Sequence, residues 1–150
     1  MTYAVFDPAS RTMTYARAGH TPLMHVTGAD NEGRRVDILT PDGMVLGLHL
    51  DRGERFDSIL QEATLNLTPG DRLVFFTDGI SEAMNDDGDC FGEPRLVQLL
   101  EDHAHLAGDE LRERIVREVE AFVGGAAQHD DMTFILIEAG GDERSDSLHA

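Results

Sequence analysis

The longest apolar runs in this chain are only four residues long, and they limit what it can fold into. Two such runs span residues 73–76 and 134–137. Both are far shorter than the ~20 apolar residues that cross a bilayer as a helix. Turn-forming or acidic residues border each run, a pattern typical of buried β-strands. We therefore expect a soluble protein built around short strands, with no membrane-spanning segment.

Turn-forming residues divide the first half of the chain into short candidate strands. We expect strands at residues 3–6, 13–18 and 23–26, separated by Asp-Pro and by Gly-His-Thr-Pro. The simplest arrangement of these three strands is an antiparallel meander. The apolar residues of 56–67 alternate only in part, and a Pro-Gly-Asp turn then introduces a buried strand at 72–77.

Two amphipathic helices are expected in the second half. The first has apolar residues on one side over 96–100 and ends near 103–106. The second spans about 109–123, with acidic residues at its start and two glycines after its end. A final strand is expected at 132–138. Strands followed by two helices and another strand favour an α+β sandwich.

No repeat or linker divides residues 1–139, so we expect a single domain there. Residues 140–150 are polar and predict a disordered tail. The single cysteine, Cys90, cannot form an intramolecular disulfide and is expected to be a small packing residue. The N-terminus has no basic segment followed by an apolar one, so we expect a cytoplasmic protein.

The chain is strongly acidic, with 12 Lys and Arg against 29 Asp and Glu and a formal net charge of −17. Such a field repels the phosphate backbones of nucleic acids and the headgroups of anionic lipids. A general nucleic-acid or membrane-surface role is therefore disfavoured. Cations are the natural counterparts of this chain.

Two acidic segments border the apolar runs. Asp78 follows the strand at 72–77 and precedes Gly79, and strand ends are where a rigid scaffold presents ligands. Asp130 and Asp131 introduce the last strand. If the two segments meet at one rim of the sheet, their oxygens suit a hard cation such as Mg²⁺ or Mn²⁺. A simple Asp-Gly turn and a solvated loop are the alternatives.

Six short motifs occur in one order along the chain. They are AGHTP (18–22), LGL (46–48), LTPGD (67–71), TDGISEA (77–83), FG (91–92) and QHDDMT (128–133). This ordered set resembles the bacterial metal-dependent serine/threonine phosphatases of the SpoIIE and RsbU type, which are relatives of the type 2C protein phosphatases. The likeness runs from about Tyr3 to Glu138. Six motifs in sequence are far more specific than any one of them.

The resemblance implies an α-β-β-α sandwich whose sheet rim holds two Mn²⁺ or Mg²⁺ ions through aspartates. A metal-bridged water would attack the phosphorus of a phosphoserine or phosphothreonine, with no catalytic side chain beyond that water. By the same resemblance Asp78 and Asp130 are metal ligands, and Asp131 is a weaker candidate. Glu82 and His129 are candidates for hydrogen bonding to a metal-bound water or a ligand carboxylate, with an exposed or capping role as the alternative for His129.

The resembled family carries a further acidic metal-binding motif upstream of everything matched here. We therefore expect this chain to represent the C-terminal portion of the catalytic domain, with at least one metal-binding carboxylate missing. Apolar faces left open by the missing portion predict self-association into a homo-oligomer. The expected partner is a phosphorylated anti-anti-sigma-type protein in a partner-switching pathway. The alternative function is a non-catalytic, phosphatase-like interaction module.

Overall fold

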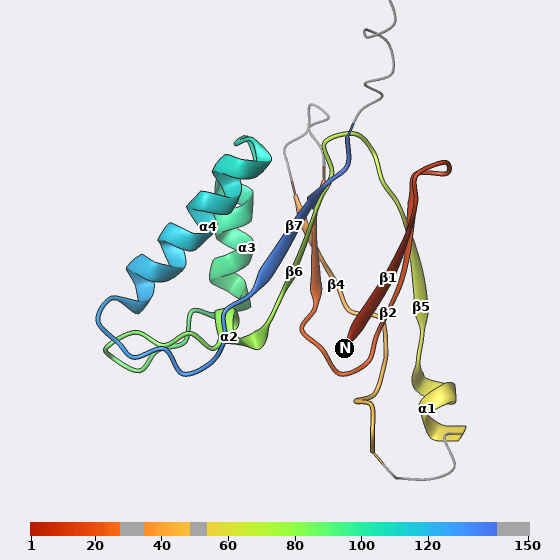
Figure 1. Cartoon of the computed structure of the whole chain (residues 1–150), viewed down its shortest axis with the longest axis horizontal. Helices are drawn as coiled ribbons and strands as arrows, with labels where there is room; N and C mark the ends of the chain where they lie inside the picture. The colour runs from red at the N-terminus through yellow and green to blue at the C-terminus, as the bar shows by residue number, and fades with distance from the viewer. Residues whose placement is uncertain (28–34, 49–53, 141–150) are drawn as a thin grey trace, which may run out of the picture.

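Two antiparallel β-sheets face each other in the computed structural model, which describes residues 1–27, 35–48 and 54–140 (Figure 1). The strands are β1 (Thr2–Asp7), β2 (Thr12–Arg17), β3 (Leu23–Val26), β4 (Val36–Leu39), β5 (Glu62–Asn66), β6 (Arg72–Phe76) and β7 (Phe134–Glu138). The helices are α1 (Glu54–Ile59), α2 (Asp78–Ser81), α3 (Gly92–Asp102) and α4 (Gly108–Val123). One sheet has the order β1-β2-β5 and the other has the order β4-β3-β6-β7.

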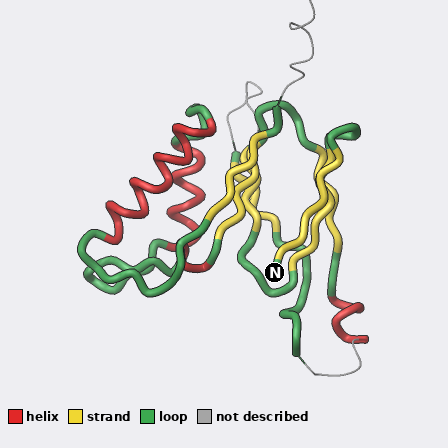
Figure 2. The backbone as a smooth tube through the Cα atoms, viewed as in Figure 1, coloured by secondary structure: helices red, strands yellow, loops and turns green. Residues whose placement is uncertain are grey.

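The three-stranded sheet has one buried and one open face because its side chains alternate. Met13 and Tyr15 of β2 point inward and are 0% and 3% exposed, whereas Tyr3 and Val5 of β1 are 65% and 52% exposed. Successive side chains of a strand lie on opposite faces, so this alternation decides which face meets the other sheet. In the described part of the chain, α3 and α4 lie on the far side of the sandwich from the open face (Figure 2).

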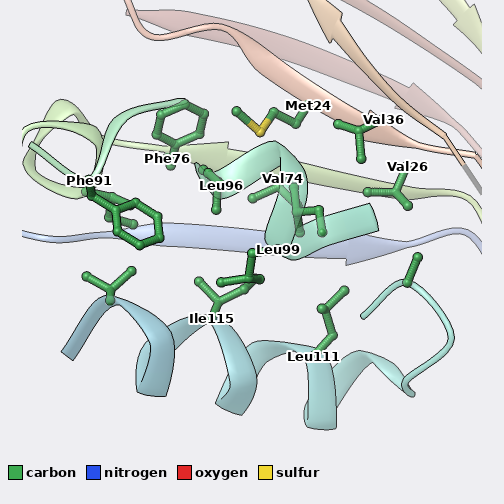
Figure 3. Close-up of a cluster of buried hydrophobic side chains, with 14 of the residues drawn as sticks. Met24, Val26, Val36, Val74, Phe76, Phe91, Leu96, Leu99, Leu111 and Ile115 are labelled. Atoms are coloured by element: carbon green, nitrogen blue, oxygen red, sulfur yellow. The ribbon is translucent and has the colours of Figure 1, made fainter. Parts of the chain in front are cut away.

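The four-stranded sheet is covered on both faces. All four residues of β3 are buried, because one face of the strand meets the other sheet and the opposite face meets the helices. Leu111, Ile115 and Val119 of α4 recur every four residues and form the apolar side that packs on the sheet. Figure 3 shows Leu111 and Ile115 directed toward the strands. Burial of each such side chain contributes roughly 1.5–3 kcal/mol.

The α+β class and the two packed antiparallel sheets are confirmed. The expected meander of the first three strands is wrong, because β3 pairs with β4 and β6 and leaves the sheet of β1 and β2. The burial patterns give the reason. Only one face of β2 is buried, whereas β3 is buried on both faces and needs a place inside the helix-covered sheet.

Cys90 was expected to be a small packing residue, and this expectation is also wrong. The residue is exposed and forms an isolated β-bridge with Met84. That bridge closes a surface turn between α2 and α3, and a side chain in such a turn has no core to enter.

No helix within the described ranges is both long and apolar enough to cross a membrane. Residues 141–150, most of the tail that we expected to be disordered, lie outside the described residues. The single-domain boundary and the self-association of the chain stay predictions.

Candidate functional site

The two acidic segments predicted from the sequence meet where the end of β6 lies beside the start of β7 (Figure 1). Phe76 at the end of β6 is paired with Phe134 at the start of β7. Asp78 begins α2 just after β6, and Asp130 and Asp131 come just before β7. Antiparallel pairing therefore puts both segments on the same rim of the sheet.

The two segments are joined through Thr77 and Gly79. The Thr77 hydroxyl donates a hydrogen bond to the Asp131 carbonyl oxygen at 2.9 Å and accepts one from the Thr133 backbone N–H at 3.0 Å. The Thr77 backbone N–H donates to the Thr133 carbonyl oxygen at 2.9 Å. A Cβ added to Gly79 would lie 2.4 Å from the Asp131 carbonyl oxygen, so only glycine permits this close approach.

The three carboxylates at this rim are exposed, and they have no cationic partner among the residues that the structure describes. Within the described ranges, no arginine or histidine forms an ion pair with Asp78, Asp130 or Asp131. The Asp130 Oδ1 atom accepts a hydrogen bond from the Asp131 backbone N–H at 2.7 Å, which holds this carboxylate against its own turn. Neighbouring carboxylates repel one another, and a divalent cation with oxygen ligands relieves that repulsion.

The donor chemistry of this rim fits a hard divalent cation, whereas the number of donors falls short of a full set. Carboxylate oxygens are the ligands that Mg²⁺ and Mn²⁺ prefer. Among the residues that the structure describes, however, no group of three or more His, Cys, Asp or Glu side chains is placed to hold a metal ion. The described residues of this rim therefore do not by themselves make up a complete cation site.

Glu82 and His129 lie beside the same rim. Both line a small pocket of ≈ 70 Å³ together with Gly79 and Asp130. Glu82 follows α2, and its backbone N–H donates to the Asp78 carbonyl oxygen at 2.7 Å. The fold thus gathers these two sequence-predicted residues with the Asp130 segment, in a space large enough for about one or two water molecules.

A larger hollow, of ≈ 260 Å³, lies at the opposite end of the sandwich, and its acidic groups already have partners. The Asp7 carboxylate accepts hydrogen bonds from Ser10, Asp71 Oδ2 accepts one from the Thr68 backbone N–H, and Glu138 is paired with Arg72. This hollow therefore offers a cation fewer open ligands than the smaller rim site does.

Sequence reasoning missed two threonines that hold the rim. Besides Thr77, the Thr21 hydroxyl donates to the carbonyl oxygen of Phe76, the last residue of β6. The same hydroxyl lies 3.0 Å from Nδ1 of His20. Thr21 and His20 belong to the AGHTP motif, so this motif anchors the end of β6. No local pattern predicts these contacts, because Thr21 and Phe76 are 55 residues apart.

Comparison with known proteins gives a family match and several relatives. The family model described as Stage II sporulation protein E (SpoIIE) matches residues 1–140. The chain is 29% identical over 141 residues to the phosphoserine phosphatase RsbU of Bacillus subtilis (strain 168), a match that covers 91% of this chain and 38% of RsbU. Across the curated relatives, the chain spans only 20% to 38% of their length.

Two solved structures share the fold. The SiaA-PP2C domain of Pseudomonas aeruginosa matches with a TM-score of 0.68 and 22% identity, over 92% of this chain and 50% of that one. The manganese-presoaked phosphatase domain of SpoIIE from Bacillus subtilis matches with a TM-score of 0.62 and 15% identity, over 99% of this chain and 59% of that one. The family match over residues 1–140 shows that the chain belongs to the SpoIIE family, and the two structural likenesses show that it shares the fold of these phosphatase domains.

Proposed function

We propose that this chain acts as a domain, or part of a domain, of a metal-dependent phosphoprotein phosphatase that hydrolyses phosphoserine or phosphothreonine. The observation that carries the proposal is the meeting of Asp78 with the Asp130–131 segment at one rim, in a member of a phosphatase family. Asp78 and Asp130 would bind Mn²⁺ or Mg²⁺, with Asp131 as an additional candidate. A bound divalent ion supplies charge stabilisation for phosphoryl oxygens and lowers the pKa of a coordinated water.

The electrostatics of the chain support a cation at this rim. A phosphoserine carries a charge of about −1.5 to −2 near neutral pH, and this chain has a formal net charge of −17. Without a cation, the exposed carboxylates would repel the substrate. The role of the protein is therefore to hold the carboxylates in place, while Glu82 and His129 border the space beside them where water can be oriented.

The substrate and location belong to the same proposal. The resemblance to RsbU-type phosphatases supports a phosphorylated anti-anti-sigma-type protein as the substrate, within a partner-switching pathway. A relative named a phosphoserine phosphatase supports phosphoserine as the reacting group. We place this reaction in the cytoplasm, where a single exposed thiol such as Cys90 stays reduced.

Phosphate release from a phosphoserine peptide tests the proposal. The 150-residue chain is assayed while Mn²⁺ is titrated in, alongside Asp78→Asn and the control Asp109→Asn. Asp109 is an exposed carboxylate at the start of α4, away from the rim. Release that needs Mn²⁺, survives in the control and disappears in Asp78→Asn supports the proposal. Release without metal, or an unimpaired Asp78→Asn variant, contradicts it.

A second candidate is a non-catalytic interaction module. The incomplete donor set among the described residues favours it, because binding a phosphoprotein needs fewer cation ligands than turning it over. Under this reading, the chain retains a phosphoserine protein in a pull-down and releases no phosphate from it at any Mn²⁺ concentration. Turnover by the isolated chain would rule the module out.

A further inference from the structure

Thr77 occupies a helix-capping position and does not cap its helix. It is the N-cap residue of α2, with φ −89° and ψ 157°, and its side chain makes no capping hydrogen bond. An N-cap threonine ordinarily accepts a hydrogen bond from a backbone N–H in the first turn of its own helix. The Thr77 hydroxyl faces the segment before β7 instead.

The hydrogen bonds of that hydroxyl reach the backbone of the segment before β7. Its one proton goes to the Asp131 carbonyl oxygen at 2.9 Å, while its oxygen accepts the Thr133 backbone N–H at 3.0 Å. One hydroxyl thus satisfies an acceptor and a donor on the opposite segment, two residues apart. Serine can make the same pair of bonds, and valine, which has nearly the same shape as threonine, can make neither.

Gly79 is an independent sign that the spacing across this junction is fixed. The missing side chain lets the first turn of α2 approach the Asp131 backbone, where a Cβ would meet the carbonyl oxygen at 2.4 Å and the carbonyl carbon at 2.8 Å. Thr77 holds the Asp131 segment close, and Gly79 sets how close it comes. Asp78 lies between these two residues, and Asp130 is next to Asp131.

We propose that Thr77 is a positioning residue: its hydroxyl ties the Asp131 segment to the end of β6 and so fixes the separation of Asp78 from Asp130. The part of this inference that concerns cation binding rests on the proposed function. The part that concerns the tie itself rests on the hydrogen bonds alone. A carboxylate pair held at a constant separation binds a cation better than a pair that must be ordered on binding.

Amide hydrogen exchange tests the tie without any metal. The variants are Thr77→Val and the rescue variant Thr77→Ser. The matched control is Thr64→Val, which removes a hydroxyl that pairs with the Thr14 hydroxyl at 2.9 Å in the other sheet. We expect exchange at the Thr133 amide to rise about fivefold in Thr77→Val. Exchange there should stay unchanged in the other two variants, as should exchange at the central β6 residue Val74 in all three.

Mn²⁺ binding, measured by titration calorimetry, tests the consequence. We expect Thr77→Val to weaken Mn²⁺ binding by about tenfold or more, since loss of a group that supports a metal ligand commonly costs 10–100-fold. Thr77→Ser and Thr64→Val should bind as the unmodified chain does. A merely structural role would lower the melting temperature of metal-free Thr77→Val and leave its Mn²⁺ affinity intact, so melting curves are recorded alongside.

The outcomes separate this inference from the proposed function. If the unmodified chain binds no Mn²⁺, the proposed metal site fails in this chain, and the exchange data alone decide whether Thr77 forms the tie. If Thr133 exchange is unchanged in Thr77→Val, the tie is wrong. If exchange rises and Mn²⁺ binding stays equal to that of the unmodified chain, the positioning role is wrong.

Discussion

The two ends of the β6–β7 pair carry charged residues in opposite situations. At the start of β6, Asp71 and Arg72 are 3% and 6% exposed. Arg72 donates from Nε to Glu138 Oε2 and from a terminal nitrogen to the Ala104 carbonyl oxygen, both at 2.9 Å. His25 Nε2 lies 3.2 Å from Asp71 Oδ2, close enough for an ion pair although the contact lacks hydrogen-bond geometry. The buried charged side chains at this end therefore have polar or charged partners within the protein.

At the other end, Asp78, Asp130 and Asp131 are exposed, and none has a cationic partner in the described ranges. A buried charge must be paired within the protein, whereas an exposed cluster of like charges stays hydrated and can bind a cation from solution. One strand pair therefore holds a structural set of charges at one end and, under the proposed function, a binding set at the other. Substitutions at the two ends should therefore affect different properties.

The largest effect on stability is expected from Arg72→Met at the structural end. Loss of the guanidinium leaves the Ala104 carbonyl without this donor and Glu138 without its partner. We expect the free energy of unfolding to fall by about 2–3 kcal/mol, measured by urea denaturation. The control Arg112→Met breaks an exposed contact of 3.8 Å with Asp109 and should cost less than about 0.5 kcal/mol. Equal losses of unfolding free energy in the two variants would contradict the structural role of the charges at the start of β6.

Gly79→Ala should have the next largest effect, at the binding end. The added Cβ must displace the Asp131 carbonyl oxygen, so we expect a loss of about 1–2 kcal/mol in the free energy of unfolding. Mn²⁺ affinity should fall as well, because the Asp130–131 segment moves away from Asp78. Gly125→Ala is the control, since its Cβ would lie an ordinary 3.6 Å from the nearest Asp86 atoms. A Gly79→Ala chain as stable as the control would contradict the close approach.

Asp78→Asn should barely change the stability of the metal-free chain. Its side chain is exposed, so we expect a change within about 0.5 kcal/mol in the free energy of unfolding. Added Mn²⁺ should raise the melting temperature of the unmodified chain and not that of the variant, because a ligand stabilises only the state that binds it. A clear loss of stability without metal would show that Asp78 belongs to the structural set.

The smallest effect is expected from Ser10→Ala, at an exposed carboxylate that is satisfied locally. The Ser10 hydroxyl, helped by the backbone N–H groups of Ala9 and Ser10, lowers the pKa of Asp7 below its usual 3.8. This stabilisation is present above the unfolded-state pKa and is lost as the pH falls through the lower folded-state value. In Ser10→Ala the pKa of Asp7 should rise toward 3.8, as measured by NMR titration. Stability should be slightly lower above that pKa and unchanged in strong acid, where the carboxyl is protonated in both chains. An unchanged pKa would mean that the backbone donors alone suffice.

Elements with a strong local pattern could be predicted from the sequence. The continuous apolar run of β6 and the four-residue repeat of Leu111 and Ile115 in α4 both gave the correct type of element. The short helices α1 and α2, of 6 and 4 residues, have no such repeat, and the four-residue strand β4 gives only a weak signal. The pairing of β2 with β5, through Thr14 and Thr64, depends on a contact across 50 residues. Local patterns carry no information on such a contact.

In the candidate site, too, some residues could be predicted from local sequence patterns and others could not. Asp78 and Asp130 could be identified because each borders an apolar run and belongs to a motif that the resembled family shares. The hydroxyl of Thr77 could not be assigned a role, because sequence rules for a threonine before a helix predict capping of that helix. Its actual partners depend on how β6 and β7 align, which is a property of the whole sheet.

The distance along the chain between the two halves of the rim has a consequence for synthesis. Thr77 and Asp131 are 54 residues apart, and α3 and α4 lie between them. Ribosomes add ~5–20 residues per second, so roughly 3–11 seconds pass between the emergence of the two halves. A chain still being made thus carries one half of the rim while the residues that complete it do not yet exist. The cation site that we propose at this rim can therefore form only after β7 and the segment before it have been added.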